Sequence, residues 1–381
     1  METGNIAQIF SNPQHPYTKG LLACRPPLDC QVRRLPTVSD FMELVTNANG
    51  ELEIREKVGK LEEIEEPAGE TDETHVLQTR TRVDNSSPTF VQLNSSTDNP
   101  SVTSVTKSAA NQALLKIENL QVGFPVKGMF GQTKRLFMAV NGVSFEVKSG
   151  ETLGLVGESG CGKSTLARAI LQLIPPTSGR VFFEGEEIKK GQKYARKLRW
   201  LRRDLQIIFQ DPFSSLNPRL TVGAAVMEPM LIHGVGKGYK ERRDRSVYLL
   251  ERVGLNAEAL NRYPHEFSGG QRQRICIARA LALNPKFVIC DESVSALDVS
   301  VQAQVLNLLK ELQGEFGLTY IFISHDLSVV KFMSDRIVVM NKGKIEEIDE
   351  AEKIYREPKT EYTRQLIASI PTGNLERIRV G

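Results

Sequence analysis

A short glycine-rich segment between an apolar run and a helical pattern has the residue types and spacing of a phosphate-binding loop. In LGLVGESGCGKST, the pattern G-x-x-x-x-G-K-[ST] follows one apolar run and precedes a helical pattern. Glycines let the backbone curl so that its N–H groups face an anion, and the helix N-terminus that follows favours negative charge. Lys163 would neutralise phosphate charge, and the hydroxyl of Ser164 would ligate Mg²⁺. A simple strand-to-helix turn is the alternative. We assign nucleotide contacts to the whole loop: Gly157, Glu158, Ser159, Gly160, Cys161, Gly162, Lys163, Ser164 and Thr165.

A second apolar run, FVIC, ends in two adjacent carboxylates, Asp291 and Glu292. In open α/β sheets, ligands bind beyond the carboxyl ends of the strands, so this pair should reach the same edge as the loop. Asp291 would hold Mg²⁺, and Glu292 would polarise the attacking water, a role worth about 10² to 10⁴ in rate. Such a pair can also simply cap a helix, but the nearby Lys163 loop favours catalysis.

The elements that must position these residues alternate along the chain after Leu114. Apolar runs at 153–156, 287–290 and 320–324 have the character of buried parallel strands. Helical patterns lie between them, and the one from Lys163 to Ile174 has a single apolar face. This alternation predicts an α/β layer architecture.

Composition restricts the possible partners. The 381 residues include 49 basic and 46 acidic ones, and this balance argues against a protein devoted to nucleic acid. The five cysteines lack metal-ligand spacing, which favours a reducing compartment. No run approaches the roughly 18 apolar residues needed to cross a bilayer, and the polar start lacks a secretory apolar core. A membrane role would therefore require separate membrane subunits.

An internal repeat relates the two ends of the chain. Residues 9–26 match residues 354–371 without gaps and share, among others, a Pro, a Tyr-Thr pair and a closing Pro. We interpret residues 1–37 as the closing tail of a related module, which implies a truncated tandem protein or a rearranged gene; chance similarity is the alternative. Residues 38–112 are expected to form a flexible linker, in which Leu52–Ile64 could form a short surface helix.

The segment EFSGGQRQRICIARAL makes the chain resemble ABC ATPases. A serine and two glycines at a helix start can form a second anion cradle, and these residues match the signature motif of that family. The resemblance implies that this motif grips a nucleotide held by the loop of another protomer, so that a monomer is nearly inert. The matching residues are Ser268, Gly269, Gly270 and Gln271.

The remaining family motifs occur in the expected order. Gln210 in LQIIFQDP resembles the Q-loop, residues 295–298 the D-loop, and His325 in FISHD the switch histidine. The resemblance implies that Gln210 contacts Mg²⁺ and that Gln210, Lys163 and His325 join Glu292 in catalysis. Phe124 in VGFPV takes the place where the family stacks an aromatic ring on adenine, although Phe137 is near.

Longer phrases, such as QDPFSSLNPRLTVG and YREPKTEYTRQLIASIP, resemble the ATP-binding subunits of oligopeptide, dipeptide, nickel and glutathione importers. The resemblance implies a P-loop NTPase of the ABC type over residues 113–345, with a mixed sheet core and a helical signature subdomain at about 212–278. The family's C-terminal extension would follow at 346–381. Some members ligate an iron–sulfur cluster in the tail, but Cys24 and Cys30 are too few, so no metal is expected there.

The same resemblance implies cofactors, partners and location. ATP and Mg²⁺ would be the cofactors, and a second ATPase protomer, identical or different, would complete each site. Two transmembrane permease subunits and, indirectly, an extracytoplasmic solute-binding protein would be the partners, with no nucleic acid. The chain would lie peripherally on the cytoplasmic face of the cell membrane.

Two other functions remain open. A soluble ABC ATPase of the translation or DNA-repair type would use the basic stretch 189–203, although a solvated amphipathic helix is favoured there. An inactive remnant of a tandem importer ATPase is the other possibility. The intact catalytic motifs argue against it.

Overall fold

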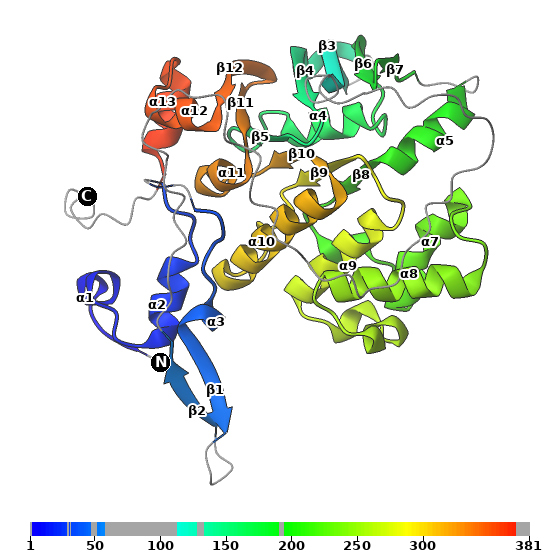
Figure 1. The fold of residues 1–381 in the computed structure, drawn as a ribbon. Helices are drawn as coiled ribbons and strands as arrows, with labels where there is room; N and C mark the ends of the chain where they lie inside the picture. The colour runs from blue at the N-terminus through cyan, green and yellow to red at the C-terminus, as the bar shows by residue number, and fades with distance from the viewer. Residues whose placement is uncertain are drawn as a thin grey trace, which may run out of the picture.

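The computed structural model describes residues 2–28, 30, 32–46, 52–57, 113–127, 133–189 and 194–370. Its centre is a sheet of six strands, seen edge-on in Figure 1. Adjacent strands are parallel from β8 to β11, and β12 pairs antiparallel with β11, so the sheet is mixed. The strand order is β12 (Lys344–Glu350), β11 (Arg336–Asn341), β5 (Thr152–Val156), β10 (Thr319–Ile323), β9 (Phe287–Asp291) and β8 (Leu205–Ile208).

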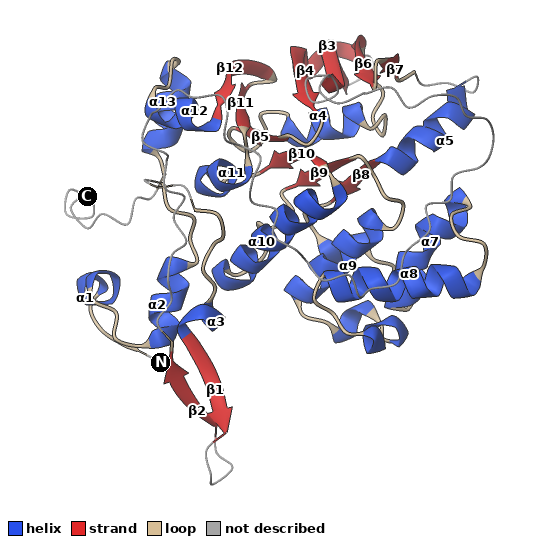
Figure 2. Ribbon diagram, in the orientation of Figure 1, coloured by secondary structure: helices blue, strands red, loops and turns tan. Residues whose placement is uncertain are grey.

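The three apolar runs that the sequence marks as parallel strands are β5, β9 and β10, and all three are buried along their full length. Successive side chains of a strand point to opposite faces of a sheet. Val288 and Tyr320 accordingly enter one core, with α9 (Gly269–Leu281), α10 (Val299–Phe316) and α11 (Leu327–Met333). Ile289 and Ile321 enter the other, with α4 (Lys163–Ile170). Helices on both faces therefore account for the uninterrupted apolar runs, as Figure 2 shows.

A second sheet covers the α4 side of the molecule. It is antiparallel, and its residues Leu115, Ile117 and Val181 are buried in the same core as α4. The sequence prediction of an α/β fold with a mixed sheet core is confirmed. The strands of the second sheet are β4 (Thr133–Lys148), β3 (Ala113–Lys127), β6 (Ser178–Phe183) and β7 (Glu186–Glu187).

A helical subdomain leaves the main sheet after β8 and returns to it at β9. Thr221 caps α7 by accepting a hydrogen bond from the Ala224 N–H, and Ser268 caps α9 in the same way. α5 (Ala195–Asp204) precedes β8 and contains residues 195–203 of the basic stretch expected to be an amphipathic helix. The other elements are α6 (Pro212–Ser215), α7 (Val222–His233), α8 (Tyr239–Arg252) and two 3₁₀ segments, Ala257–Asn261 and Pro264–Glu266.

The N-terminal segment corrects part of the linker prediction. Residues 38–46 and 52–57 are folded, and the expected surface helix is wrong at its start, where Leu52–Glu56 forms a strand. This strand, β2, pairs antiparallel with β1 (Met42–Thr46), which satisfies the backbone groups of both segments that face each other. Residues 58–64 lie outside the described residues, as does most of the expected linker. Three short helices precede the hairpin: α1 (Ile6–Ser11), α2 (Pro16–Ala23) and α3 (Val38–Phe41).

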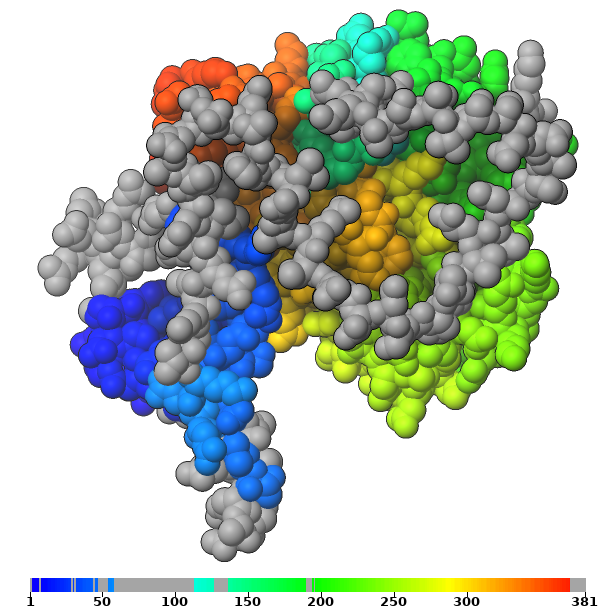
Figure 3. Space-filling model, viewed as in Figure 1, coloured from blue at the N-terminus to red at the C-terminus, as the bar shows by residue number. Residues whose placement is uncertain are grey.

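Part of this N-terminal segment packs against the main core, while the β1–β2 hairpin projects away from it (Figures 1 and 3). Leu35 is fully buried in the core that contains α10. The buried Asn307 amide donates to the Leu35 C=O and accepts from the Leu35 N–H, both at 2.8 Å. Lys331 of α11 donates to the Leu28 C=O at 2.7 Å. The side chain of Asn307 thus satisfies backbone groups of a segment 272 residues earlier in the chain.

Two helices end the described chain, α12 (Ala351–Arg356) and α13 (Glu361–Ala368), which lie together beside β12 in Figure 1. Ile354 of α12 is fully buried in the main core. Residues 371–381 lie outside the described residues. Within the described part of the chain, no helix combines the length and the apolar character needed to cross a bilayer.

Candidate nucleotide site

The glycine-rich loop joins β5 to α4, and its glycines are required by the backbone. Gly157 and Gly162 have φ angles of +146° and +110°, which L side chains rarely adopt. A Cβ atom at Gly157 would lie 2.1 Å from the Met340 carbonyl oxygen, and one at Gly162 would lie 2.2 Å from that of Ala139. The loop therefore follows the neighbouring backbone too closely for any larger residue, and Gly162 caps the start of α4.

Lys163 is buried under this loop. Its ammonium donates to the Gly157 carbonyl at 2.7 Å and to the Glu158 carbonyl at 2.9 Å, and it lies 3.7 Å from the Cys161 sulfur. Neutral carbonyl groups satisfy its donors but leave a positive charge at the centre of the loop. An anion bound to the loop would meet this charge.

Ser164 and Asp291 meet at the carboxyl edge of the sheet. The Ser164 hydroxyl donates to the Asp291 carboxylate at 2.8 Å, which connects the first turn of α4 with the end of β9. Burial raises the pKa of Asp291, and the hydrogen bond from Ser164 and the charge of Arg168 oppose that shift. A hydroxyl and a carboxylate in contact are hard oxygen ligands of the kind that Mg²⁺ takes. The donor set therefore fits the predicted metal.

Glu292 is the next residue and has an unusual backbone. Its φ angle is +49°, which is uncommon for a residue other than glycine and tends to occur at functional sites. Its N–H donates to the Ile323 carbonyl at 3.0 Å, which ties it to β10. Its carboxylate accepts a hydrogen bond from Gln210 at 2.9 Å and lies 3.9 Å from Nδ1 of His325. The structure thus brings together three residues that the sequence assigned to catalysis.

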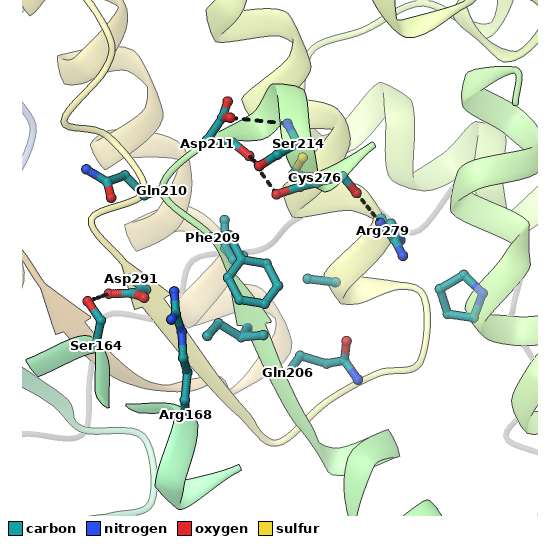
Figure 4. A pocket seen from close by; sticks show the side chains of 15 residues that line it. Ser164, Arg168, Gln206, Phe209, Gln210, Asp211, Ser214, Cys276, Arg279 and Asp291 are labelled. Atoms are coloured by element: carbon teal, nitrogen blue, oxygen red, sulfur yellow. Dashed lines mark hydrogen bonds between the residues drawn. The ribbon is translucent and has the colours of Figure 1, made fainter. Parts of the chain in front are cut away.

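A pocket of about 590 Å³ extends from the Ser164–Asp291 pair toward the helical subdomain. In Figure 4, Ser164 and Asp291 lie on one side of it, while Cys276 and Arg279 of α9 lie on the other. The segment containing Gln210 crosses between them, held by α6, whose Ser215 hydroxyl donates to the Asp211 carbonyl at 2.7 Å. Movement of the helical subdomain would therefore act directly on Gln210.

A smaller pocket of about 270 Å³ opens beside the loop, and an aromatic ring in its wall could contact a bound nucleotide. Its walls include residues 158–161, residues 341–343 and Phe137. Phe124, the ring expected from the sequence, is not among them. Phe124 and Phe137 face each other across the β3–β4 ladder, but β4 is the strand that runs beside the loop, since its Ala139 carbonyl touches Gly162.

The signature segment begins α9. The Ser268 hydroxyl accepts from the Gln271 N–H at 3.3 Å, and the Gln271 side chain accepts from the Ser268 N–H at 3.0 Å, which completes a capping box. A Cβ at Gly270 would lie 2.2 Å from Val301, so glycine is needed for α9 to pack on α10. A Cβ at Gly269 would find its nearest neighbour, Leu297, at 3.9 Å. Gly269 therefore faces outward at the start of this helix.

Sequence reasoning missed a contact of the loop with the C-terminal extension. The Glu158 N–H donates to the Tyr362 hydroxyl of α13 at 3.1 Å. Tyr362 is one of the residues that recur in the internal repeat, which was the available signal. Arg168, which lines the larger pocket near Asp291, was also missed, because a basic residue inside an amphipathic helix carries no motif.

Comparisons with known proteins agree with this geometry. The family model "ABC transporter" matches residues 140–295, and the model "Oligopeptide/dipeptide transporter, C-terminal region" matches residues 1–50 and 347–379. Among curated relatives, the glutathione import ATP-binding protein GsiA of Pectobacterium atrosepticum is 44% identical over 99% of this chain and 52% of its own length. The Escherichia coli protein of the same name is 42% identical over 100% and 53%. The chain thus spans about half the length of the curated relatives it matches.

Solved structures give the same result. The ATP-binding cassette MJ0796, described as dimeric and bound to ADP and Pi after hydrolysis, is 31% identical with a TM-score of 0.55. The match covers 62% of this chain and 98% of that cassette. CbiO1 of Clostridium perfringens, part of the transporter complex CbiONQ, is 29% identical with a TM-score of 0.55, over 70% and 99% of the two chains. On its fold, its site and these relatives, the chain belongs to the ABC transporter family of ATP-binding cassettes.

Proposed function

We propose that this chain hydrolyses ATP to drive the import of oligopeptides, dipeptides or a related solute such as glutathione through a partner membrane permease. The observation that carries the proposal is the meeting of Ser164 with Asp291, and of Gln210 with Glu292, beside a loop that holds Lys163. The names of the relatives, which are glutathione import ATP-binding proteins, support the choice of solute class. The match to the transporter C-terminal region supports it independently.

The side chains at the sheet edge have separate roles in the proposed reaction. Lys163 and the loop N–H groups bind the phosphates of ATP, while Ser164, Asp291 and Gln210 hold Mg²⁺. When bound, the metal neutralises charge on the phosphate oxygens. Glu292 orients the attacking water and accepts its proton, and His325 stands 3.9 Å from that carboxylate, where it can stabilise the charged arrangement. Gln210 links this group to the helical subdomain.

The adenine is proposed to stack on Phe137 rather than on Phe124, because Phe137 lines the pocket beside the loop. We expect Phe137→Ala to raise the dissociation constant of ATP by about 5- to 150-fold, the effect of losing one base–aromatic stack of about 1–3 kcal/mol. The matched control Phe124→Ala should change it by less than twofold. Equilibrium titration with a fluorescent ATP analogue measures both, and the reverse ranking would restore Phe124 as the adenine contact.

The signature segment is proposed to complete the site of a second protomer. Gly269 faces outward at a helix N-terminus, where the backbone favours an anion. The phosphate-binding loop leads into α4 and the signature segment begins α9, and these two helices pack in cores on opposite faces of the main sheet. The signature segment is therefore proposed to meet the nucleotide of another protomer and not that of its own loop. The second protomer can be a copy of this chain or a different ATPase.

The surface proposed to receive the permease lies on α5, α6 and α7. Large apolar side chains are exposed there, close to the pocket that contains Gln210. α5 and α7 are held together by a hydrogen bond from Arg199 to the Ile232 carbonyl. We propose a peripheral position on the cytoplasmic face of the membrane, where contact with the solute-binding protein is made only through the permease. The exposed side chains are Trp200, Phe213, Leu231 and Ile232.

The import function can be tested with a variant that hydrolyses ATP but no longer drives solute uptake. Leu231 is 64% exposed on α7, so Leu231→Ser should leave the fold and basal ATP hydrolysis within twofold of the wild type. Solute uptake by vesicles containing the assembled importer should fall at least tenfold, because the apolar contact with the permease is lost. Ile54→Ser, an exposed apolar residue on β2 at the other end of the molecule in Figures 1 and 3, is the control. Unchanged uptake in both variants would refute this docking surface.

The structure gives less support to a soluble ABC ATPase of the translation or DNA-repair type. In the basic stretch, Lys189 pairs with Glu187 at 2.8 Å and Lys197 with Glu186 at 2.7 Å. These exposed ion pairs reduce the positive field that phosphates of nucleic acid would need. The inactive alternative is weakened by the convergence of the catalytic side chains described above.

A further inference from the structure

A tyrosine of the C-terminal extension is in direct contact with the phosphate-binding loop. The Tyr362 hydroxyl accepts a hydrogen bond of 3.1 Å from the Glu158 N–H, although the two residues are 204 positions apart. Tyr362 is partly buried against the main core. Burial raises the pKa of this phenol, so it stays protonated at neutral pH. The contact is therefore a neutral hydrogen bond between the extension and the loop.

Glu158 is held from two sides. Its N–H is bound by Tyr362, while its carbonyl accepts from Lys163 at 2.9 Å and from the Cys161 N–H at 3.2 Å. Glu158 directly follows Gly157, where the chain leaves β5. The Tyr362 hydroxyl thus fixes the same peptide segment that positions the buried lysine. A shift of α13 would be passed to the loop through this residue.

The C-terminal extension that carries Tyr362 is held to the main sheet by several hydrogen bonds. Glu347 of β12 is buried, and its carboxylate accepts from the Lys359 N–H at 3.0 Å and from the Thr360 N–H at 3.3 Å. Thr360 in turn caps α13 by accepting from the Thr363 N–H at 3.2 Å. These bonds attach the start of α13 to the edge strand of the main sheet. Tyr362 is consequently held at a defined position relative to the loop.

The internal repeat supplies an equivalent residue without this contact. Tyr17 occupies the place of Tyr362 in the first copy of the repeat, on a helix of the same length, α2. Its side chain is 41% exposed, and its helix packs beside α3 and α10 rather than beside the loop. A substitution at Tyr17 therefore tests the effect of changing the tyrosine of the repeated helix alone. The same substitution at Tyr362 also removes the contact with the nucleotide site.

We infer that Tyr362 is a positioning residue of the nucleotide site, through which the C-terminal extension sets the geometry of the phosphate-binding loop and hence the affinity for nucleotide. This inference rests on the proposed ATPase function. It assigns to the extension an influence on the loop of its own cassette. A preorganised loop spends less binding free energy on ordering itself around the phosphates.

The test compares Tyr362→Phe with Tyr17→Phe in the full chain. Loss of one neutral hydrogen bond should raise the ATP dissociation constant and KM by about 2- to 12-fold, with kcat within twofold of the wild type. Tyr17→Phe should leave all three unchanged. Thermal unfolding midpoints of both variants should stay within about 5 °C of the wild type, the shift that the loss of one hydrogen bond allows, which separates positioning of the loop from a general loss of stability. An unchanged dissociation constant in Tyr362→Phe, or an equal effect in both variants, would overturn the inference.

Hydrogen exchange of the Glu158 amide provides a readout that does not depend on ATPase activity. Tyr362→Phe should accelerate this exchange severalfold in the absence of nucleotide, whereas Tyr17→Phe should not. If the wild-type chain binds no ATP, the proposed function fails, while faster exchange would still show that Tyr362 positions the loop. If exchange at Glu158 is the same in all three proteins, the positioning role itself is wrong.

Discussion

Replacement of Glu292 by glutamine is expected to lower ATP turnover by about 10² to 10⁴, the contribution typical of a positioned general base. The amide has the same shape and can keep a hydrogen bond to Gln210, but it cannot accept a proton from water. ATP should therefore bind with nearly wild-type affinity and remain uncleaved. Phosphate release under saturating Mg-ATP measures turnover, and retention of labelled ATP after rapid desalting measures trapping.

The control for this variant is Glu258→Gln, which changes an exposed carboxylate in the 3₁₀ segment of the helical subdomain. It should hydrolyse ATP at the wild-type rate. Undiminished hydrolysis by the Glu292 variant would reject the role given to that residue. Loss of both binding and hydrolysis would instead indicate a structural role for its carboxylate.

The second large effect is expected at Gly269. An aspartate there fits the fold, because a Cβ meets no atom closer than 3.9 Å and a carboxylate is favourable in the first turn of a helix. In the assembled dimer, however, the same carboxylate would face the phosphates of the partner's nucleotide. One like-charge contact at about 4 Å costs about 4 kcal/mol near a protein surface, which is a factor of about 10³ in turnover. ATP binding to the isolated chain should be unchanged.

Gly238→Asp is the matched control for this charge, because Gly238 caps α8 and a Cβ there meets nothing within 4 Å. Both variants place an acid at an open helix start, but only Gly269 lies in the signature segment. Steady-state hydrolysis and ATP titration of the two proteins give the comparison. Wild-type turnover in Gly269→Asp would contradict the assignment of this segment to a partner's nucleotide.

The arrangement of the candidate site could be predicted from the sequence because its main parts are local. The spacing from Gly157 to Ser164 dictates a loop between a strand and a helix, and the carboxylates of Asp291 and Glu292 directly follow a buried strand. Parallel strands bring such ends to one edge, so their meeting follows from the fold class. The contact of Gln210 with Glu292 agrees with the order of family motifs along the chain.

The contacts that could not be predicted join distant segments. No periodic pattern in the sequence signals the pairing of Asn307 with the Leu35 backbone or the hydrogen bond from Glu158 to Tyr362. The sequence predicts linker and helix where β1 and β2 form a hairpin, because β2 carries three charged residues in five and each strand depends on pairing with the other. The choice between Phe124 and Phe137 required knowing which strand runs beside the loop.

The most direct measurement is a structure of the assembled ATPase dimer carrying Glu292→Gln with Mg-ATP. We predict one triphosphate on the loop at residues 157–165, with its metal at Ser164 and Asp291 and with the substituted amide at position 292 beside the terminal phosphate. The signature segment of the partner should lie on the opposite side of that phosphate. A nucleotide bound elsewhere, or a loop site whose phosphates face solvent with no partner segment against them, would contradict the account.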